Sequence, residues 1–130
     1  YGTDPVLVEI YDWYTVNTPD NGVHSPGQKA PNRWGLYDVQ GNLSEWCYDV
    51  YAEDYYEQSP AIAPTGPEYG SSRVVRGGSI KSKPVECRIA DRSQAAPEAK
   101  SPTVGFRLVR ETLPTCPKYY PPIETAQAQE

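Results

Sequence analysis

The chain has 130 residues and a formal charge of −5, with 14 prolines, 10 glycines, 11 tyrosines and only one phenylalanine. This length allows one domain, and the composition predicts a loop-rich fold whose core relies on aromatic side chains. The acidic balance argues against a nucleic-acid-binding protein, which needs clustered Lys and Arg, and no apolar stretch is long enough to cross a bilayer.

The first predicted elements are short. Residues 6–10 form an apolar run that suits either a brief helix or a strand, because periodicity over so few residues does not distinguish them. Turn-forming residues follow from Asn17 to Gly22. His24 is the single histidine of the chain, and we interpret it as a surface residue rather than a ligand.

The segment from Pro31 to Tyr51 has the highest density of large side chains. We expect these to be buried, because large apolar and aromatic side chains dominate cores; they are Trp34, Leu36, Tyr37, Trp46, Tyr48 and Tyr51. Gly35 and Gly41 are expected to adopt positive φ. Apolar and polar residues alternate over residues 43–50, which predicts a half-buried strand.

Residues 40–45 of this segment read Gln-Gly-Asn-Leu-Ser-Glu, and we call them the polar kernel. Their carboxylate, amide and carbonyl oxygens are hard ligands of the kind that calcium prefers. The alternative is that Asn42 caps a turn and that Glu45 pairs with an arginine such as Arg92 or Arg107.

The rest of the chain alternates loops with short elements. A helical turn is expected at residues 52–56, and strands are expected at residues 73–76, 87–90 and 104–109. The pair Gly77-Gly78 indicates a bulge or a close backbone approach. Residues 111–130 are rich in proline and predict an extended tail, which leaves residues 1–110 as the domain.

The three cysteines are Cys47, Cys87 and Cys116. They form neither a CxxC pair nor a zinc spacing, so they predict one disulfide with a spare thiol, or three unreactive thiols. A single redox-active thiol is the alternative.

Four ordered segments resemble the formylglycine-generating enzyme family, also called the sulfatase-modifying factor domain. They are residues 32–47, 73–79, 88–92 and 105–110. The resemblance implies an irregular, loop-rich α+β fold that is similar to a C-type lectin, with short antiparallel strands. In the family the first segment lies near the middle of the domain, so this chain corresponds to a C-terminal half.

The resemblance also implies a metal site and a catalytic site. Family members hold calcium in the polar kernel, which carries over to Gln40, Gly41, Leu43 and Glu45, with Asn42 close by. The family enzymes bind copper through cysteines three and eight residues after the serine of Gly-Gly-Ser. Here Ser79 is followed at those places by Ser82 and Cys87. A hydroxyl is a poor ligand for Cu(I), so we expect no copper site; Cys87, Ser82 and Ser79 are the candidates if the chain is active.

Five arginines accompany these motifs: Arg73, Arg76, Arg88, Arg92 and Arg107. We expect them on strands, bound to acidic or carbonyl partners and serving as scaffold, because a guanidinium donates several hydrogen bonds at once. The alternative is that they line an anion or substrate pocket with Ser79 and Gln94 nearby.

Two functions from different classes follow. The first is a structural or protein-binding subunit, stabilised by calcium, that has lost the copper-binding cysteine pair. The second is an active oxidoreductase of the same family, generating formylglycine on sulfatases or performing another oxidative, sulfoxide-synthase type of chemistry. In either case half a domain exposes apolar surface, so we expect association with another polypeptide: the missing N-terminal half or a separate subunit. The cysteines and the calcium favour a location outside the cytoplasm, in the periplasm, the secretory pathway or the medium.

Overall fold

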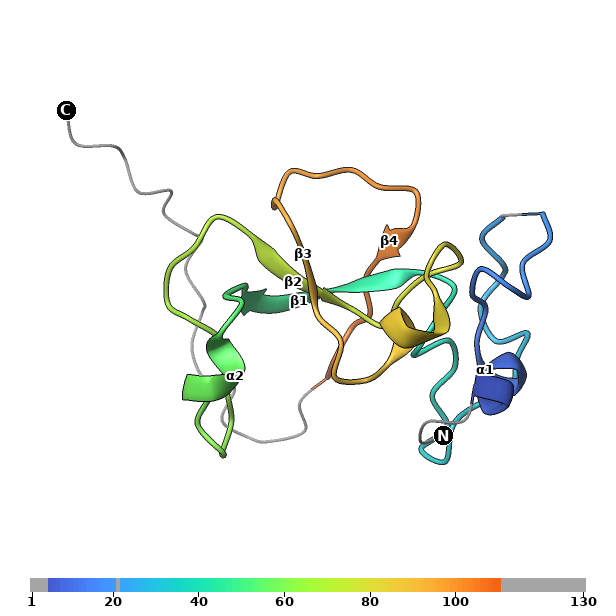
Figure 1. The fold of residues 1–130 in the computed structure, drawn as a ribbon, viewed down its shortest axis with the longest axis horizontal. Helices are drawn as coiled ribbons and strands as arrows, with labels where there is room; N and C mark the ends of the chain where they lie inside the picture. Colours follow the sequence, from blue (N-terminus) through green and yellow to red (C-terminus); the bar gives the residue numbers. More distant parts are fainter. Residues whose placement is uncertain (1–4, 21, 111–130) are drawn as a thin grey trace.

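The computed structural model describes residues 5–20 and 22–110. The elements in chain order are α1 (Pro5–Tyr11), β1 (Ser44–Val50), α2 (Tyr55–Gln58), β2 (Arg73–Arg76), a 3-10 helix (Pro84–Cys87), β3 (Ser93–Ala95) and β4 (Val104–Gly105). Figure 1 shows the sheet in the middle of the molecule, with α1 and α2 at opposite ends. Long loops connect these short elements, as the proline and glycine content predicts.

The four strands form one sheet in the order β3-β2-β1-β4. The pairs β1–β2 and β2–β3 are antiparallel, and the first of them has a register shift between Trp46 and Val50. Strand β4 instead runs parallel to β1, with Ser44 opposite Val104. The expectation of antiparallel strands is therefore wrong for β4, because the chain crosses from β3 to the far edge before it pairs.

The core lies on both sides of β2. Val74 and Val75 are consecutive in this strand and point to opposite faces, yet both are buried, so each face of the sheet is covered there. Ile80 and Cys87 are buried as well. Polar side chains share this interior, namely Asp12, Thr18, Asp38, Asn42 and Ser79. Loops cross the core, so their backbone groups need buried hydrogen-bond partners.

The predicted elements agree with the structure in part. Residues 6–10 lie in helix α1, which decides the alternative left open by their pattern. The predicted strand at 73–76 is β2, and the strand predicted at 43–50 is β1. The strand expected at 104–109 is limited to Val104–Gly105, and the helical turn begins at Tyr55 rather than at residue 52.

The strand expected at residues 87–90 is wrong. Pro84 starts a 3-10 helix that ends at Cys87, where the fixed φ of proline suits the first helical position. The strand in this part of the chain is Ser93–Ala95, which has no alternation of apolar residues. Its pairing with β2 alone defines it, so the sequence pattern contains no signal for it.

The large side chains between Pro31 and Tyr51 are less buried than expected. Trp34 is 66% exposed and Tyr48 is 51% exposed, and Leu36 and Tyr37 are exposed too. Two of the rings are covered by arginines instead of by the core. The guanidinium carbon of Arg33 lies 4.4 Å from the centre of the Trp34 ring, and that of Arg73 lies 4.8 Å from the Tyr48 ring. The simple alternation predicted for β1 therefore does not hold.

Two further expectations concern the tail and membrane spans. The extended tail predicted at residues 111–130, with Cys116, lies outside the described residues. Within the described residues, no helix has the length and apolar character needed to span a membrane.

Candidate functional site

Asn42 in the polar kernel joins three separate segments. Its side-chain oxygen accepts the N–H of His24 at 3.0 Å, and its amide nitrogen donates to the carbonyl of His24 at 2.9 Å. Its backbone N–H donates to the carbonyl of Trp13 at 2.7 Å, and its own carbonyl accepts the N–H of Ile80 at 3.1 Å. Asn42 adopts φ 63°, a region that asparagine tolerates better than most residues.

Gly41 is needed for a close approach rather than for its φ. A Cβ atom at this position would collide with the carbonyl oxygen of Trp13 and would lie 2.9 Å from its nitrogen. The expectation of positive φ is wrong for Gly41 and correct for Gly35, which has φ 77°. The kernel backbone therefore lies directly against the segment that follows α1.

Gln40 extends the same set of contacts. Its backbone N–H donates to Oδ1 of the fully buried Asp12 at 2.9 Å. Its side-chain amide donates to the carbonyl of Cys87 at 2.8 Å, which connects the kernel to the 3-10 helix. Sequence reasoning missed Asp12, because a single acidic residue after an apolar run gives no sign that it is buried.

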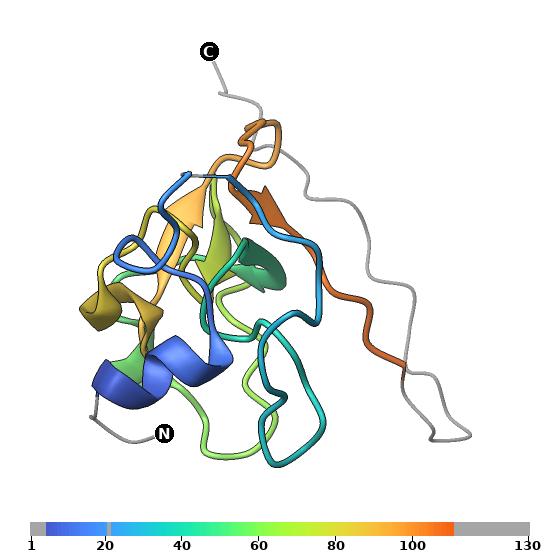
Figure 2. The ribbon, with the colours of Figure 1, turned by 90° about the vertical axis from the view of Figure 1, so that its right-hand side faces the viewer.

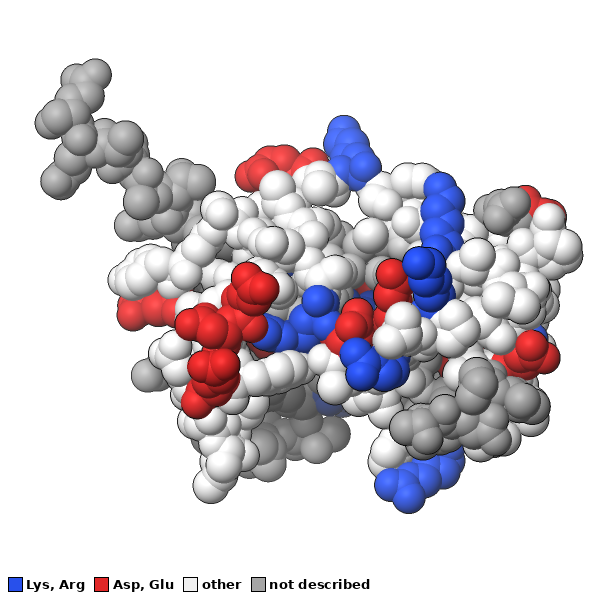
Figure 3. Space-filling model, in the orientation of Figure 1, with Lys and Arg blue, Asp and Glu red and all other residues white. Residues whose placement is uncertain are grey.

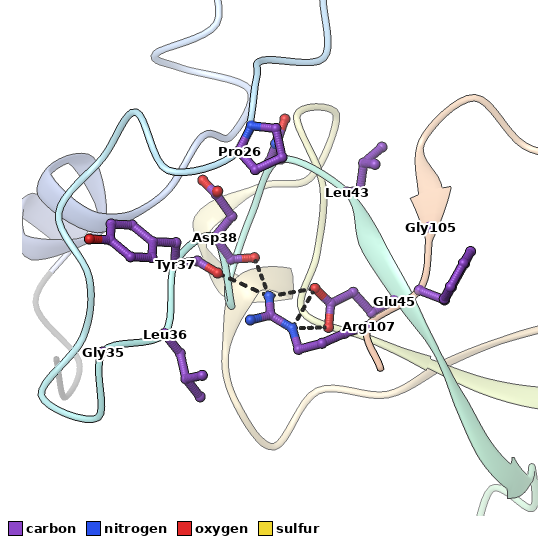
Figure 4. A pocket seen from close by; sticks show the side chains of 11 residues that line it. Pro26, Gly35, Leu36, Tyr37, Asp38, Leu43, Glu45, Gly105 and Arg107 are labelled. Atoms are coloured by element: carbon purple, nitrogen blue, oxygen red, sulfur yellow. Dashed lines mark hydrogen bonds and ion pairs between the residues drawn. The ribbon is translucent and has the colours of Figure 1, made fainter. Parts of the chain in front are cut away.

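Glu45 is paired with Arg107, as one of the two alternatives predicted. The Nε of Arg107 donates to both carboxylate oxygens at 3.0 and 2.9 Å, and its Nη2 donates to Oε1 at 2.6 Å. The same Nη2 also reaches the carbonyl of Tyr37 at 2.9 Å (Figure 4). Hydrogen bonding to Glu45 raises the pKa of Arg107, against the lowering effect of burial.

Calcium in the polar kernel stays a prediction. The described residues contain no cluster of three or more His, Cys, Asp or Glu side chains that could hold a metal ion, so main-chain carbonyls would have to supply most ligands. Those of Gln40, Gly41 and Leu43 are hard oxygens of the right kind. The one carboxylate of the kernel, Glu45, is shared with Arg107. A calcium ion there would meet a carboxylate whose charge is already neutralised, which favours weak binding.

A cavity of about 430 Å³ lies beside this ion pair. Figure 4 shows it between the turn at Leu36 and Tyr37 and the segment that carries Gly105 and Arg107. Most of its lining is apolar or uncharged, and the lining residues are Pro26, Gly35, Leu36, Tyr37, Asp38, Asn42, Leu43, Glu45, Gly105, Phe106 and Arg107.

The three candidate catalytic residues lie on the turn after β2 and in the 3-10 helix. Ser79 is buried, and its N–H donates to the hydroxyl of Ser82 at 3.0 Å. Ser82 also lines a smaller cavity of about 180 Å³, with Arg76, Glu86 and Asp91 among its neighbours. Gln94 is not among the residues that line it; its side-chain oxygen accepts from Ser72 at 2.7 Å.

Cys87 is 1% exposed and carries a free thiol. Burial is the main cause that raises its pKa to about 12, with further contributions from Asp12, Glu86 and Asp91. A Cβ atom on Gly78, which has φ 68°, would lie 2.8 Å from the Cys87 sulfur, so the Gly77-Gly78 pair does allow a close approach. Cys47 is also a free thiol, so these two cysteines are not joined by a disulfide.

Most of the arginines serve as scaffold, as expected. Arg73 donates to the carbonyl of Tyr48, Arg76 to that of Ile89, and Arg92 to those of Ala52 and Glu53. Only Arg73 and Arg76 lie on strands, however, and Arg88 is largely exposed and binds the carbonyl of Val85. Carbonyl oxygens rather than carboxylates are the usual partners, because irregular loops leave many carbonyls unpaired.

His24 is not a surface residue. Its ring stacks on Trp13 with centroids 3.8 Å apart and 15° between the planes, and its side chain is 19% exposed. Its Nε2 lies 3.8 Å from a carboxylate oxygen of Asp20. The histidine therefore belongs to the packing around the kernel, where Asn42 holds its backbone.

These observations define a class of protein: a small, loop-rich domain built around one sheet. The polar kernel, the Gly77-Gly78 turn and the ion pair of Arg107 with Glu45 hold its loops in place. The model of the sulfatase-modifying factor enzyme 1-like domain matches residues 6–112. The chain belongs to this family, which confirms the resemblance seen in the sequence.

Known relatives give the same result. The chain is 39% identical over 118 residues to a formylglycine-generating enzyme of Thermomonospora curvata, which covers 86% of this chain and 37% of that protein. It is 46% identical over 83 residues to the serine/threonine-protein kinase pkn1 of Chlamydia pneumoniae, covering 62% of this chain and 13% of the kinase. The chain thus spans about a third of the first relative's length.

Solved structures support the fold. Treponema denticola variable protein 1 superposes with a TM-score of 0.67 at 32% identity, covering 78% of this chain and 36% of that one. The structure of PvdO from Pseudomonas aeruginosa gives 0.64 at 26% identity, covering 75% and 38%. The irregular α+β fold expected for the family is therefore confirmed.

Proposed function

We propose that this chain is a formylglycine-generating-enzyme-like domain without the two-thiolate copper site, and that it acts as a structural or protein-binding subunit together with another polypeptide. The observation that carries this proposal is Ser82. It stands where the resemblance places the first copper thiolate, and its hydroxyl is already an acceptor for the N–H of Ser79. An oxygen in that place does not replace a thiolate for Cu(I).

The state of Cys87 supports the same proposal. A thiolate is the form that binds metals and reacts, and a pKa of about 12 keeps this sulfur protonated at neutral pH. Copper binding would have to remove that proton inside a buried site that Asp12, Glu86 and Asp91 make negative. One buried thiol without a second thiolate is therefore a poor starting point for copper-dependent oxidation.

The exposed apolar side chains support association with another polypeptide. Phe106 is 74% exposed and Leu108 is 87% exposed, on the segment that runs away from the sheet beyond β4 in Figure 2. Exposed apolar surface of this kind marks interaction sites in soluble proteins. Roughly two thirds of the Thermomonospora curvata relative lies outside the part that this chain matches, and we propose that a polypeptide equivalent to some of that remainder covers this surface. We also propose that calcium, bound through the polar kernel, stabilises the assembled domain.

A Cu(I) titration against a chromogenic chelator tests the loss of the copper site. We expect the unchanged chain and Cys87→Ser to compete equally weakly, and Ser82→Cys to gain a tight site that Cys87→Ser removes again. A tight stoichiometric site in the unchanged chain that depends on Cys87 would overturn the proposal. It would favour the active oxidoreductase instead, the activity named for the formylglycine-generating relatives.

Native mass measurement tests the association separately. We expect the isolated chain to be found in complexes or to self-associate through its apolar surface. A folded, monodisperse monomer of 14.5 kDa would contradict the association and leave the copper result untouched.

A further inference from the structure

The 430 Å³ cavity beside Glu45 and Arg107 carries a net negative charge. Its charged lining residues are Asp38, Glu45 and Arg107. The guanidinium of Arg107 is paired with the Glu45 carboxylate and also donates to the carbonyl of Tyr37. The two opposite charges make this pair neutral as a unit. The carboxylate of Asp38 remains, and it makes the cavity favourable for a cation.

Asp38 has an unused acceptor. The residue is only 9% exposed, and its Oδ2 accepts the N–H of Gly27 at 2.8 Å. Its other oxygen, Oδ1, is buried and has no hydrogen-bond partner among the described residues. A buried carboxylate oxygen without a donor costs free energy, so a ligand that brings a donor to Asp38 recovers that cost on binding.

The walls of the cavity define what kind of cation fits. Leu36, Leu43 and Phe106 supply apolar surface, and Tyr37 adds a second aromatic ring. A divalent metal ion at Asp38 would need several more oxygen ligands around that carboxylate, whereas an alkylammonium places its carbon stem along apolar walls and its charge at one end. Aromatic faces add to the attraction for an ammonium group.

We propose that this cavity binds the ammonium group of a lysine side chain, presented by an extended segment of the partner polypeptide. This inference rests on the proposed association and names the chemistry of that partner. The ion pair of Arg107 with Glu45 fixes the segment after β4, in which the exposed Phe106 and Leu108 flank Arg107 in sequence, and Phe106 also lines the cavity. An extended partner segment lies along this segment and places its lysine in the cavity beside Asp38.

The overall charge of the chain favours this occupant over a membrane surface. A formal charge of −5 attracts a basic polypeptide and repels anionic lipid, and Figure 3 shows acidic side chains clustered at the α2 end of one face, with lysines and arginines elsewhere on that face. In Figure 4 the Asp38 carboxylate lies next to Pro26. The following residue, Gly27, donates its N–H to Oδ2 of this carboxylate. Entry of an ammonium group to Oδ1 therefore moves this turn, and the amide of Gly27 reports the event directly.

Nuclear magnetic resonance titrations of the full chain, in the assembly it forms, test the proposal. The probe is the capped tripeptide acetyl-Val-Lys-Val-amide, compared with the same peptide carrying norleucine or glutamate in place of lysine and with butylammonium. We expect the lysine peptide to shift the amide signals of Gly27, Asp38 and Gly105. Asp38→Asn keeps the acceptor for Gly27 and is expected to weaken binding about tenfold or more. The matched control Glu98→Gln removes one exposed negative charge outside the cavity and is expected to change little.

Each other outcome overturns the inference. Equal binding of the norleucine peptide would remove the role of charge, and butylammonium binding as tightly as the lysine peptide would make this a free-amine site. An equal loss in Asp38→Asn and Glu98→Gln would reduce the effect to general electrostatics. If the lysine peptide fails to bind while the chain still assembles with a partner, the cavity inference fails and the proposed function stands.

Discussion

The side-chain amide of Asn42 binds both backbone polar groups of His24, donating to its carbonyl and accepting from its N–H. Asn42 thereby satisfies both main-chain polar groups of one residue, and the pairing fastens the loop between α1 and the kernel to the centre of the domain. Together with the backbone bonds of Asn42 to Trp13 and Ile80, it makes the kernel a junction of loops. Its contribution to stability is measurable.

Replacing Asn42 by alanine is expected to lower the free energy of unfolding by about 2–4 kcal/mol, because it leaves two part-buried backbone groups of His24 without their partners. Asn42→Asp keeps the acceptor and loses the donor, so it should cost less than alanine. Urea unfolding measures both changes. Asn32→Ala, which removes two comparable bonds in an exposed turn, is the control and should cost far less.

Gly41→Ala is expected to destabilise the fold by about 3 kcal/mol or more, because the new methyl group collides with backbone atoms of Trp13 and not with a flexible side chain. Gly35→Ala meets nothing within 4 Å and is strained only by its φ of 77°, at a cost of about 1–2 kcal/mol. Thermal unfolding of the two variants gives the comparison. Equal losses would show that the close approach at Gly41 is not a constraint.

Arg107→Lys is expected to destabilise the domain by about 1 kcal/mol, since lysine cannot reproduce the forked bonds to Glu45 and to the carbonyl of Tyr37. The pair is partly exposed to solvent, which keeps the value low. Arg110→Lys, at an exposed position, is the matched control. If the two variants have the same denaturant midpoint, the ion pair of Arg107 with Glu45 has no structural role.

Stability should fall at alkaline pH because of Cys87. Its pKa is raised in the folded state from the ordinary 9.0 to about 12, so its contribution is complete below pH 9 and is lost as pH rises from 9 toward 12. For this group the loss is at most about 1.4 kcal/mol per pH unit. Tyr14, whose pKa burial also raises, adds to the effect, so Cys87→Ala should flatten the profile only in part. A profile unchanged by the substitution would show that the thiol does not titrate with unfolding.

Calcium is expected to raise the thermal midpoint of the unchanged chain and not that of Glu45→Gln, if the kernel supplies the ligands predicted from the family. Magnesium is the control, because it demands a stricter octahedral geometry than carbonyl-rich loops provide. If millimolar calcium does not shift the thermal midpoint, calcium has no part in the proposed function. The guanidinium of Arg107 is then the cation that neutralises Glu45.

The family, the fold class and the strand at residues 73–76 could be predicted from the sequence. They depend on local motifs and on glycines at positions that backbone geometry restricts. The sequence also predicted the Glu45–Arg107 pair as one of two alternatives. It gave no sign of Asp12 or of the stacking of His24 on Trp13, since both depend on segments brought together by the fold. The exposure of Trp34 and Tyr48 was missed because aromatic content alone predicts burial, whereas arginine side chains cover these two rings on the surface. Strand β3 has no pattern of its own, and only its pairing with β2 defines it.

The parallel pairing of β4 with β1 has a consequence for the order in which the chain folds. Residues 44 and 104 must meet for this edge of the sheet to form, and a contact between residues so distant in sequence is slow to make, because much of the chain must be ordered first. During synthesis the edge of β1 stays open until the residues around Arg107 emerge from the ribosome. The nascent chain therefore exposes this unpaired edge of β1 while residues 51–103 are made, so it depends on late closure, or on an early partner, to escape aggregation.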